Sequence, residues 1–292
     1  MKNFKPYTLN QVLAGLVMVT VLTLSGCSGG DDGAAGPAGP SGAAGPAGPA
    51  GPAIGAAPSV ITENMNATIS AATVAADGTL TVNFTVVDDG GYGFHGLPSN
   101  LIRFTLVQLI PAGGRGPGES TQWQSYINKV EAAPTDPAKG PGTVDAIQAT
   151  YESNGTFVDN GDGSYIYTYN VNLMNVTSPV AVPYNADYTH RVAFQISGGG
   201  FPTMNKSYDW QPSTGFTTGI TNRKMVREET CNSCHGELAL HGGGRVDTDY
   251  CVTCHNPGSI DANTGNSVDF KVMVHKIHRG ANLPSVVAGG VY

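Results

Sequence analysis

The sequence has little charge, and basic residues are especially few. Charged residues make up 13% of the chain, with 15 lysines and arginines against 22 acidic residues, and the formal net charge is −7. A protein that binds nucleic acid needs a basic face to neutralise phosphates. The sequence therefore predicts no nucleic-acid partner.

Long hydrophobic runs are also missing. The longest, residues 12–24, contains 13 residues, whereas a transmembrane helix needs about 20. Lys2 and Lys5 precede this run, and a short basic region followed by a short apolar run is typical of an export signal. We therefore expect residues 1–26 to be a signal peptide rather than a membrane span.

The four residues LSGC at positions 24–27 directly follow the apolar run. They resemble the processing box of bacterial lipoproteins, which implies that Cys27 is lipidated and becomes the mature N-terminus. Several acyl chains hold a protein firmly in a bilayer, so outer-membrane lipid is an expected partner. Ser28 stands where an aspartate would favour inner-membrane retention, so the resemblance favours the outer membrane without fixing which face. An ordinary signal peptide with an incidental cysteine is the alternative.

Signatures of turnover enzymes are scarce as well. No nucleophile, paired carboxylates or phosphate-binding loop is recognisable, and the glycine-rich HGGGR at residues 241–245 precedes no strand–helix pattern and is interpreted as a turn. Whether the chain is an enzyme stays open, with an electron-transfer role favoured over turnover.

Glycine, in contrast, is abundant and is concentrated near the N-terminus. From residue 33 to residue 53 it recurs at every third position, which is the period of collagen. Seven such triplets without hydroxyproline favour an extended polyproline-II stalk. We expect residues 27–58 to form a lipid anchor and tether, with trimerisation through the triplets as the alternative.

Residues 59–220 contain short segments in which apolar and polar residues alternate. Such alternation is typical of half-buried strands, and its apolar members are Leu80, Val82, Phe84 and Val86; Ile102, Phe104 and Leu106; and His190, Val192, Phe194 and Ile196. The pattern predicts a mainly β fold, an antiparallel barrel or sandwich with Greek-key connections. His95 and His190 lie within this region and are interpreted as structural residues.

The sequence DNGDG at residues 159–163 runs directly into SYIYTYNVNL. Asn, Asp and Gly favour tight turns, so a hairpin is predicted, with Tyr165, Tyr167 and Tyr169 on one face of its second strand. A calcium loop is the alternative for Asp159 and Asp162, although the full ligand spacing of such loops is absent.

Two Cys-x-x-Cys-His motifs follow the β region. The first consists of Cys231, Cys234 and His235, the second of Cys251, Cys254 and His255, and 16 residues separate Cys234 from Cys251. The cysteine spacing alone also fits a zinc ribbon, and export would permit disulfides. A histidine directly after each second cysteine is needed only for haem c, in which two thiols form thioethers and the imidazole ligates the iron. We therefore predict two covalently attached haem c groups.

Three further histidines could supply the second axial ligand of each iron: His241, His275 and His278. The last two lie in the segment FKVMVHKIHRG, whose apolar spacing predicts a helix. Residues at i and i+3 share one side of a helix, so these two histidines should serve different haems. A second histidine favours low-potential electron transfer, whereas an open position would permit a peroxidase or sensor. Met273 is a rival ligand, although its apolar neighbours favour packing.

The segments GLPSNLIRFTLVQLIP, CNSCHGELALHGGGR, YCVTCHNPG and MVHKIHRGANLPSV, together with the lipoprotein box and tether, resemble the OmcA/MtrC-type decahaem outer-surface cytochromes. The resemblance implies a split β-barrel followed by a loop-rich, partly helical multihaem segment at residues 221–292. It also implies bis-histidine haems and electron transfer at the cell surface to metal oxides, soluble metals or flavins. Other multihaem cytochromes or a porin–cytochrome conduit would be partners.

The chain departs from that family in carrying two haem motifs rather than ten. We expect it to be the N-terminal fragment of a longer protein, with a short relative as the alternative. A tethered β domain that acts as an adhesin or docking module, with incidental haems, is the competing function.

Overall fold

The computed structural model describes residues 61–114, 120–133 and 145–290. The expected signal peptide, Cys27 and the glycine-rich tether lie outside these residues. Within the described part of the chain, no helix is both long and apolar enough to span a membrane.

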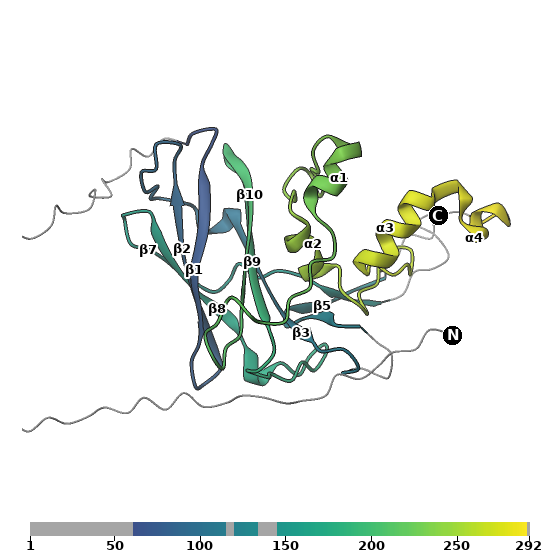
Figure 1. Cartoon of the computed structure of the whole chain (residues 1–292), viewed down its shortest axis with the longest axis horizontal. Coiled ribbons are helices and arrows are strands. Elements are labelled where there is room, and N and C mark those ends of the chain that lie inside the picture. Colours follow the sequence, from purple (N-terminus) through teal and green to yellow (C-terminus); the bar gives the residue numbers. More distant parts are fainter. Residues whose placement is uncertain (1–60, 115–119, 134–144, 291–292) are drawn as a thin grey trace, which may run out of the picture. The chain divides into compact units, whose positions relative to one another are not determined.

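The β region consists of two four-stranded antiparallel sheets and a two-stranded ribbon (Figure 1). The first sheet contains, in spatial order, β1 (Asn66–Val74), β2 (Thr79–Val87), β8 (Ser164–Asn172) and β7 (Thr156–Asp159). The second contains β10 (Phe201–Trp210), β9 (His190–Gly198), β3 (Ile102–Ile110) and β4 (Gln122–Ser125). The ribbon pairs β5 (Asn128–Glu131) with β6 (Ala146–Ala149). The mainly β antiparallel prediction is confirmed, and the two separate sheets correspond to its sandwich form.

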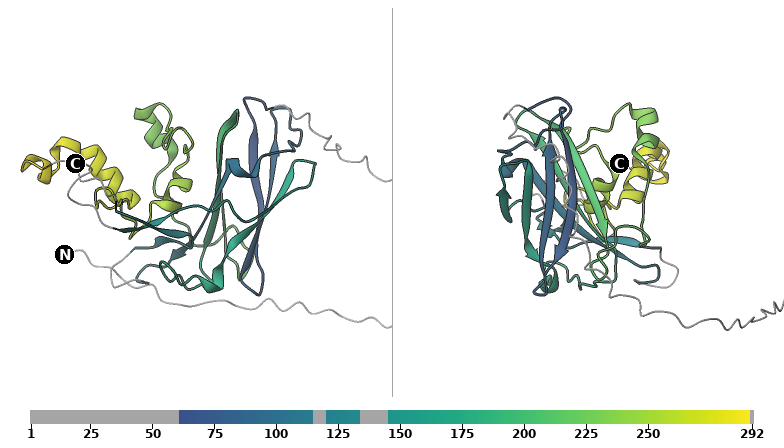
Figure 2. Two further views of the ribbon diagram at one scale, coloured as in Figure 1. Left: turned by 180° about the vertical axis from the view of Figure 1, so that it is seen from behind. Right: turned by 60° about the vertical axis from the view of Figure 1, so that its left-hand side comes forward.

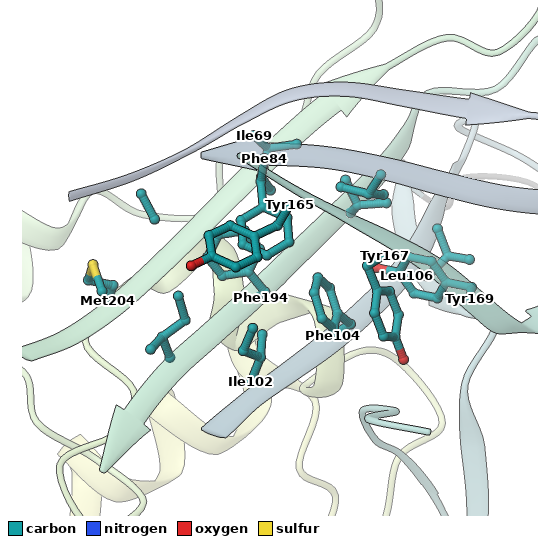
Figure 3. Packing of buried hydrophobic residues seen from close by; sticks show 14 of the residues in the cluster. Ile69, Phe84, Ile102, Phe104, Leu106, Tyr165, Tyr167, Tyr169, Phe194 and Met204 are labelled. Carbon is teal, nitrogen blue, oxygen red and sulfur yellow. The ribbon is translucent and has the colours of Figure 1, made fainter. Parts of the chain in front are cut away.

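The core lies between the two sheets and is rich in aromatic rings (Figure 3). Phe104 of the second sheet stacks on Tyr167 of the first, with ring centroids 3.7 Å apart, and Phe84 lies 5.0 Å from Phe194. Buried tyrosine hydroxyls need partners, and they find them: Tyr165 donates to the carbonyl of Phe94 and Tyr169 to that of Thr105. The alternating residues predicted to face inward are buried in β2, β3 and β9.

The predicted hairpin at residues 159–163 is present. Strand β7 pairs antiparallel with β8, and Asp159 lies opposite Tyr165. Oδ1 of Asp159 accepts a hydrogen bond from the amide of Gly161, and Oδ1 of Asp162 accepts one from the amide of Ser164. The aspartates thus stabilise the turn by the local bonds typical of Asx turns.

Strand β9 departs from the expected half-buried pattern, because it is buried on both faces. His190, Val192, Phe194 and Ile196 face the core as predicted, but Arg191, Ala193 and Gln195 on the opposite face are at most 3% exposed. Helix α2 (Thr248–Cys254) packs on this second face, against β3, β4, β9 and β10. The sequence predicted a half-buried strand because apolar residues alternate with other residues along it. That local pattern carries no information about helix α2, which begins about 50 residues further along the chain and covers the second face.

In the described part of the chain, four helices and three short 3-10 turns lie beyond or between the strands. Helices α1 (Glu228–His235), α2 and α3 (Phe270–Arg279) lie on the side of β9 that faces away from β1 and β2 (Figures 1 and 2). Helix α4 (Pro284–Val287) follows η4 (Gly280–Asn282). The remaining turns, η1 (Ser99–Leu101) and η3 (Leu173–Asn175), flank β3 and β8.

Candidate haem-binding site

The first Cys-x-x-Cys-His motif forms the second half of α1. Cys231 and Cys234 are one helical turn apart, so both thiols leave the same side of the helix. His235 is the last residue of the helix, which ends at Gly236 with a φ of +72°. No residue of α1 is buried, so the motif is open to a large group.

The second motif lies on α2 and is packed against the second sheet. Asp247 caps this helix by accepting a hydrogen bond from the amide of Asp249 at 2.6 Å. Tyr250, Cys251 and Val252 are buried against the strands, whereas His255 lies at the C-terminal end of the helix. The sheet therefore fixes the second motif more firmly than the first.

The structure places His278 beside the first motif. The rings of His235 and His278 have centroids 5.9 Å apart and are nearly perpendicular, at 88°. Nδ1 of His278 lies 2.8 Å from the carbonyl oxygen of Val274. Because a carbonyl only accepts, Nδ1 carries the hydrogen, and Nε2 is left with its lone pair available to a metal.

The structure places His241 beside the second motif. The rings of His241 and His255 also have centroids 5.9 Å apart, at 44°. Nδ1 of His255 donates to the carbonyl of Val268 at 2.8 Å, which again leaves Nε2 available. His241 has a φ of +52°, the one described non-glycine residue with a positive value.

The third candidate, His275, is brought to neither motif. It lies on α3 one turn before His278 and is exposed, and no ring pair in the described residues includes it. Of the two histidines of α3, His278 therefore lies beside the first motif, and His275 lies beside neither motif.

The second motif lies in a weakly solvated environment that lowers the pKa of its histidines. Burial lowers the pKa of His255, and burial with the nearby Arg245 and His255 lowers the pKa of His241 to about 4. Both imidazoles are therefore neutral at pH 7, which is the form that ligates metals. Burial raises the pKa of Cys251 to about 12 and also raises that of Cys254.

The geometry fits haem better than zinc. A zinc ribbon needs four sulfurs around one ion. Among the described residues, one group of at least three possible metal ligands lies within 4.8 Å of one another, and it consists of Glu228, Asp247 and Asp249. The four cysteines therefore do not surround a single point. Metal–imidazole bonds are about 2 Å long, so two imidazoles on opposite sides of one metal have centroids roughly 6 Å apart. Both histidine pairs match that separation, each beside a pair of thiols that are not in a disulfide.

Three sets of polar contacts that the sequence pattern did not predict hold the haem-motif segment in place. Two join it to the second sheet, and one joins helix α1 to helix α2. Arg191 of β9 contacts Asp249 of α2, and Asn205 of β10 bonds the backbone just before α2. Glu228 of α1 accepts from the amide and the hydroxyl of Thr248, so the N-terminal ends of the two motif-bearing helices are linked. These partners are 20 to 58 residues apart, and no local spacing signals them.

Two family models match the chain. The model described as the OmcA-like N-terminal domain matches residues 66–217, and the model described as outer membrane cytochrome MtrC/MtrF-like, domains II/IV, matches residues 223–288. The first covers the sandwich and the second covers both Cys-x-x-Cys-His motifs and all three candidate distal histidines.

Similar proteins include "Multiheme cytochrome MtrC" of Shewanella baltica (strain OS185). It is 34% identical over 221 residues, which are 73% of this chain and 30% of that protein. The crystal structure of the outer membrane decaheme cytochrome OmcA is 38% identical, with a TM-score of 0.68 over 76% of this chain and 34% of that chain. The crystal structure of MtrC from Shewanella baltica OS185 is 30% identical, with a TM-score of 0.58 and the same coverage.

The chain thus spans about a third of the length of the relatives it matches. The fold, the sequence identity and both family models agree with the resemblance carried by the two haem motifs. The chain belongs to the OmcA/MtrC-type family of multihaem outer-membrane c-type cytochromes.

Proposed function

We propose that the chain binds two haem c groups and conducts electrons between them and acceptors outside the cell. In this proposal, Cys231 and Cys234 attach the first haem, which His235 and His278 ligate. Cys251 and Cys254 attach the second, which His255 and His241 ligate. The observation that supports it is the pairing of each motif histidine with one distal histidine at the same 5.9 Å centroid separation.

We propose that His275 serves a haem that neither of these two motifs attaches. It lies one helical turn from His278 and projects from α3 without a histidine partner among the described residues. A helix that carries ligands for two haems would fix the distance between them, because residues at i and i+3 are about 5–6 Å apart.

Bound haem iron would supply a one-electron couple, and two histidine ligands favour a low potential. The protein contributes position and solvation. Glu228 and Thr248 join α1 to α2, so the two attachment sites are held at one spacing. Burial of α2 keeps water from the second motif, and hydrogen bonds from the Nδ1 atoms of His255 and His278 orient these rings.

We propose that Cys27 anchors the chain to the outer membrane through lipid and that the protein is exposed at the cell surface. Residues 1–26 would be the signal peptide, 27–58 the anchor and tether, 59–220 the β domain and 221–292 the start of the multihaem domain. Partners would be other multihaem cytochromes or a porin–cytochrome conduit. The membership in an outer-membrane cytochrome family supports this location.

Rapid mixing tests the conduction proposal. The haem-loaded protein is reduced, mixed with oxidised flavin mononucleotide or a soluble ferric chelate, and followed through its haem absorbance. We expect both haems to be reoxidised without a stable complex between the iron and the added oxidant. An adhesin role would be supported by two results together: the haems stay reduced with both oxidants, and the β domain binds cells or surfaces. A haem that binds carbon monoxide at once would support a peroxidase or sensor.

A further inference from the structure

His241 is presented by a tight turn with an unfavourable backbone conformation. The amide of Gly243 donates to the carbonyl of Leu240, and the φ values of His241 and Gly242 are +52° and +74°. Positive φ at both central residues defines a type I′ turn. Glycine adopts this conformation readily, but a histidine does so at a cost. The turn therefore depends on contacts from outside to keep His241 in place.

Those contacts come from the second sheet. Nδ2 of Asn205 donates to the carbonyl of Gly244 at 3.0 Å, and Oγ1 of Thr203 donates to that of Gly243 at 3.0 Å. Gly244 packs so closely that an added Cβ would lie 2.4 Å from Nε2 of Gln195. The turn is thus fitted directly onto strands β9 and β10.

The same Asn205 side chain also contacts the start of the helix that carries the second motif. Its Oδ1 accepts from the amide of Val246 at 2.9 Å and from that of Asp247, the N-cap of α2, at 3.3 Å. Asn205 is 6% exposed. Its carboxamide therefore joins, within one buried group, the turn that presents His241 and the helix that presents His255.

We propose that Asn205 is a positioning residue for the second haem: its carboxamide fixes the distal His241 relative to the proximal His255. This inference rests on the proposed function, because it requires that these two histidines share one iron. The residue touches neither ligand and acts through the backbone at Gly244, Val246 and Asp247. Removing it frees the turn to relax toward conformations that cost a histidine less, and His241 then leaves the iron for part of the time.

The test uses the haem-loaded chain with Asn205→Leu, a change that keeps the approximate size and removes all the hydrogen bonds. Losing buried hydrogen bonds shifts a local equilibrium by about 10- to 100-fold. We expect a high-spin signal from one of the two haems by electron paramagnetic resonance. Imidazole added from solution should bind that haem about tenfold or more tightly than in the wild type, and should restore the low-spin signal.

Three further variants separate the possible outcomes. Gln108→Leu is the matched control, because Gln108 is a buried amide whose hydrogen bonds go to Gln124, Tyr126 and the carbonyl of Pro183, all within the β region. It should leave both haems low-spin. His241→Ala should open the same haem completely. Asn205→Asp keeps the acceptor but loses the donor to Gly244. It should give a smaller high-spin signal and a smaller gain in imidazole affinity than Asn205→Leu, and it replaces that variant if the leucine protein does not fold.

Suppose that His241→Ala opens one haem but the Asn205 variant stays low-spin and binds imidazole as the wild type does. That result would overturn the positioning role of Asn205 and leave the ligand assignment intact. If His241→Ala also stayed fully low-spin, His241 would not be a ligand, and both the assignment and the inference would fall. An effect of Gln108→Leu equal to that of Asn205→Leu would show general loosening of the β domain and would likewise overturn the inference.

Discussion

Arg191 and Asp249 form an ion pair that fastens the helix carrying the second motif to the sandwich. Nη1 of Arg191 lies 2.9 Å from Oδ1 of Asp249, while its Nε and Nη2 bond both carboxylate oxygens of Asp209. The Arg191 side chain is 2% exposed, and its guanidinium lies 4.5 Å from the ring centroid of Trp123. One buried cation thus contacts two strands and α2.

Replacing Arg191 with leucine should destabilise the protein strongly. Removal of one partner from a buried pair typically costs 3–5 kcal/mol, and we expect about 3 kcal/mol because Asp209 and Asp249 keep some contact with water. Denaturant unfolding measures this cost. Lys129→Ala breaks the exposed pair with Glu131 and should cost less than about 1 kcal/mol. Equal costs for the two variants would show that the buried pair has no special role.

His190 should make the stability depend on pH. It is fully buried beside Tyr126, Tyr184 and Trp210, and burial lowers its pKa to about 4. The unfolded chain takes up the proton near pH 6.5 and the folded protein only near pH 4. The contribution is therefore fully present above pH 6.5 and is lost as the pH falls from about 6.5 to about 4, on the order of 3 kcal/mol in total.

The measurement compares the unfolding free energies of wild type and His190→Gln across that pH range, so that shared titrations such as that of Asp247 cancel. We expect the difference between the two proteins to shrink as the solution is acidified. A difference that is constant between pH 4 and pH 7 would mean that His190 does not stay neutral in the folded state.

Cys27→Ala should release the protein from the membrane. In the proposal above, the lipid on Cys27 holds the chain in the bilayer, and the apolar run before Cys27 is too short to span it. Membranes washed in high salt should keep the wild type and lose the variant. Ser28→Ala is the control and should remain bound. A Cys27→Ala protein that stays with the washed membranes would show that lipidation of Cys27 is not the anchor.

Haem content should follow the two motifs independently. When the chain is made in a host that matures c-type cytochromes, intact mass should show two haems per polypeptide. Replacing Cys251 and Cys254 with serine should leave one covalent haem, and that protein should also unfold more easily because this motif is packed against the sheet. A protein with stoichiometric zinc and no haem would refute the assignment.

Much of the fold could be predicted from the sequence because its signals are local. Alternation of apolar residues located β2, β3 and β9, and turn residues located the β7–β8 hairpin. The haem motifs could be found because their chemistry requires adjacent residues. The pairing of Tyr167 with Phe104 across the sheets has no such local signal, since the two residues are far apart in the chain.

Which candidate histidine lies beside which motif could not be predicted, for the same reason. Spacing limited the candidates to His241, His275 and His278 and separated the last two, but it did not show which lies beside which motif. The contacts that Asn205 and Arg191 make with the second haem-motif region join residues 41 and 58 positions apart, and such long-range contacts have no local sequence signal. His241 also adopts a left-handed backbone, in a turn whose Gly244 carbonyl accepts a hydrogen bond from Asn205 of the sheet.

The central claim is that each haem is ligated by one motif histidine and one distal histidine, His278 for the first and His241 for the second. Electron paramagnetic resonance of the oxidised, haem-loaded chain tests it most directly, with single His→Met changes at the three candidate positions. We predict two low-spin haems in the wild type, one altered haem in each of His241→Met and His278→Met, and an unchanged spectrum in His275→Met. An altered spectrum in His275→Met with none in His278→Met would contradict the pairing, and a high-spin haem in the wild type would contradict the electron-transfer account itself.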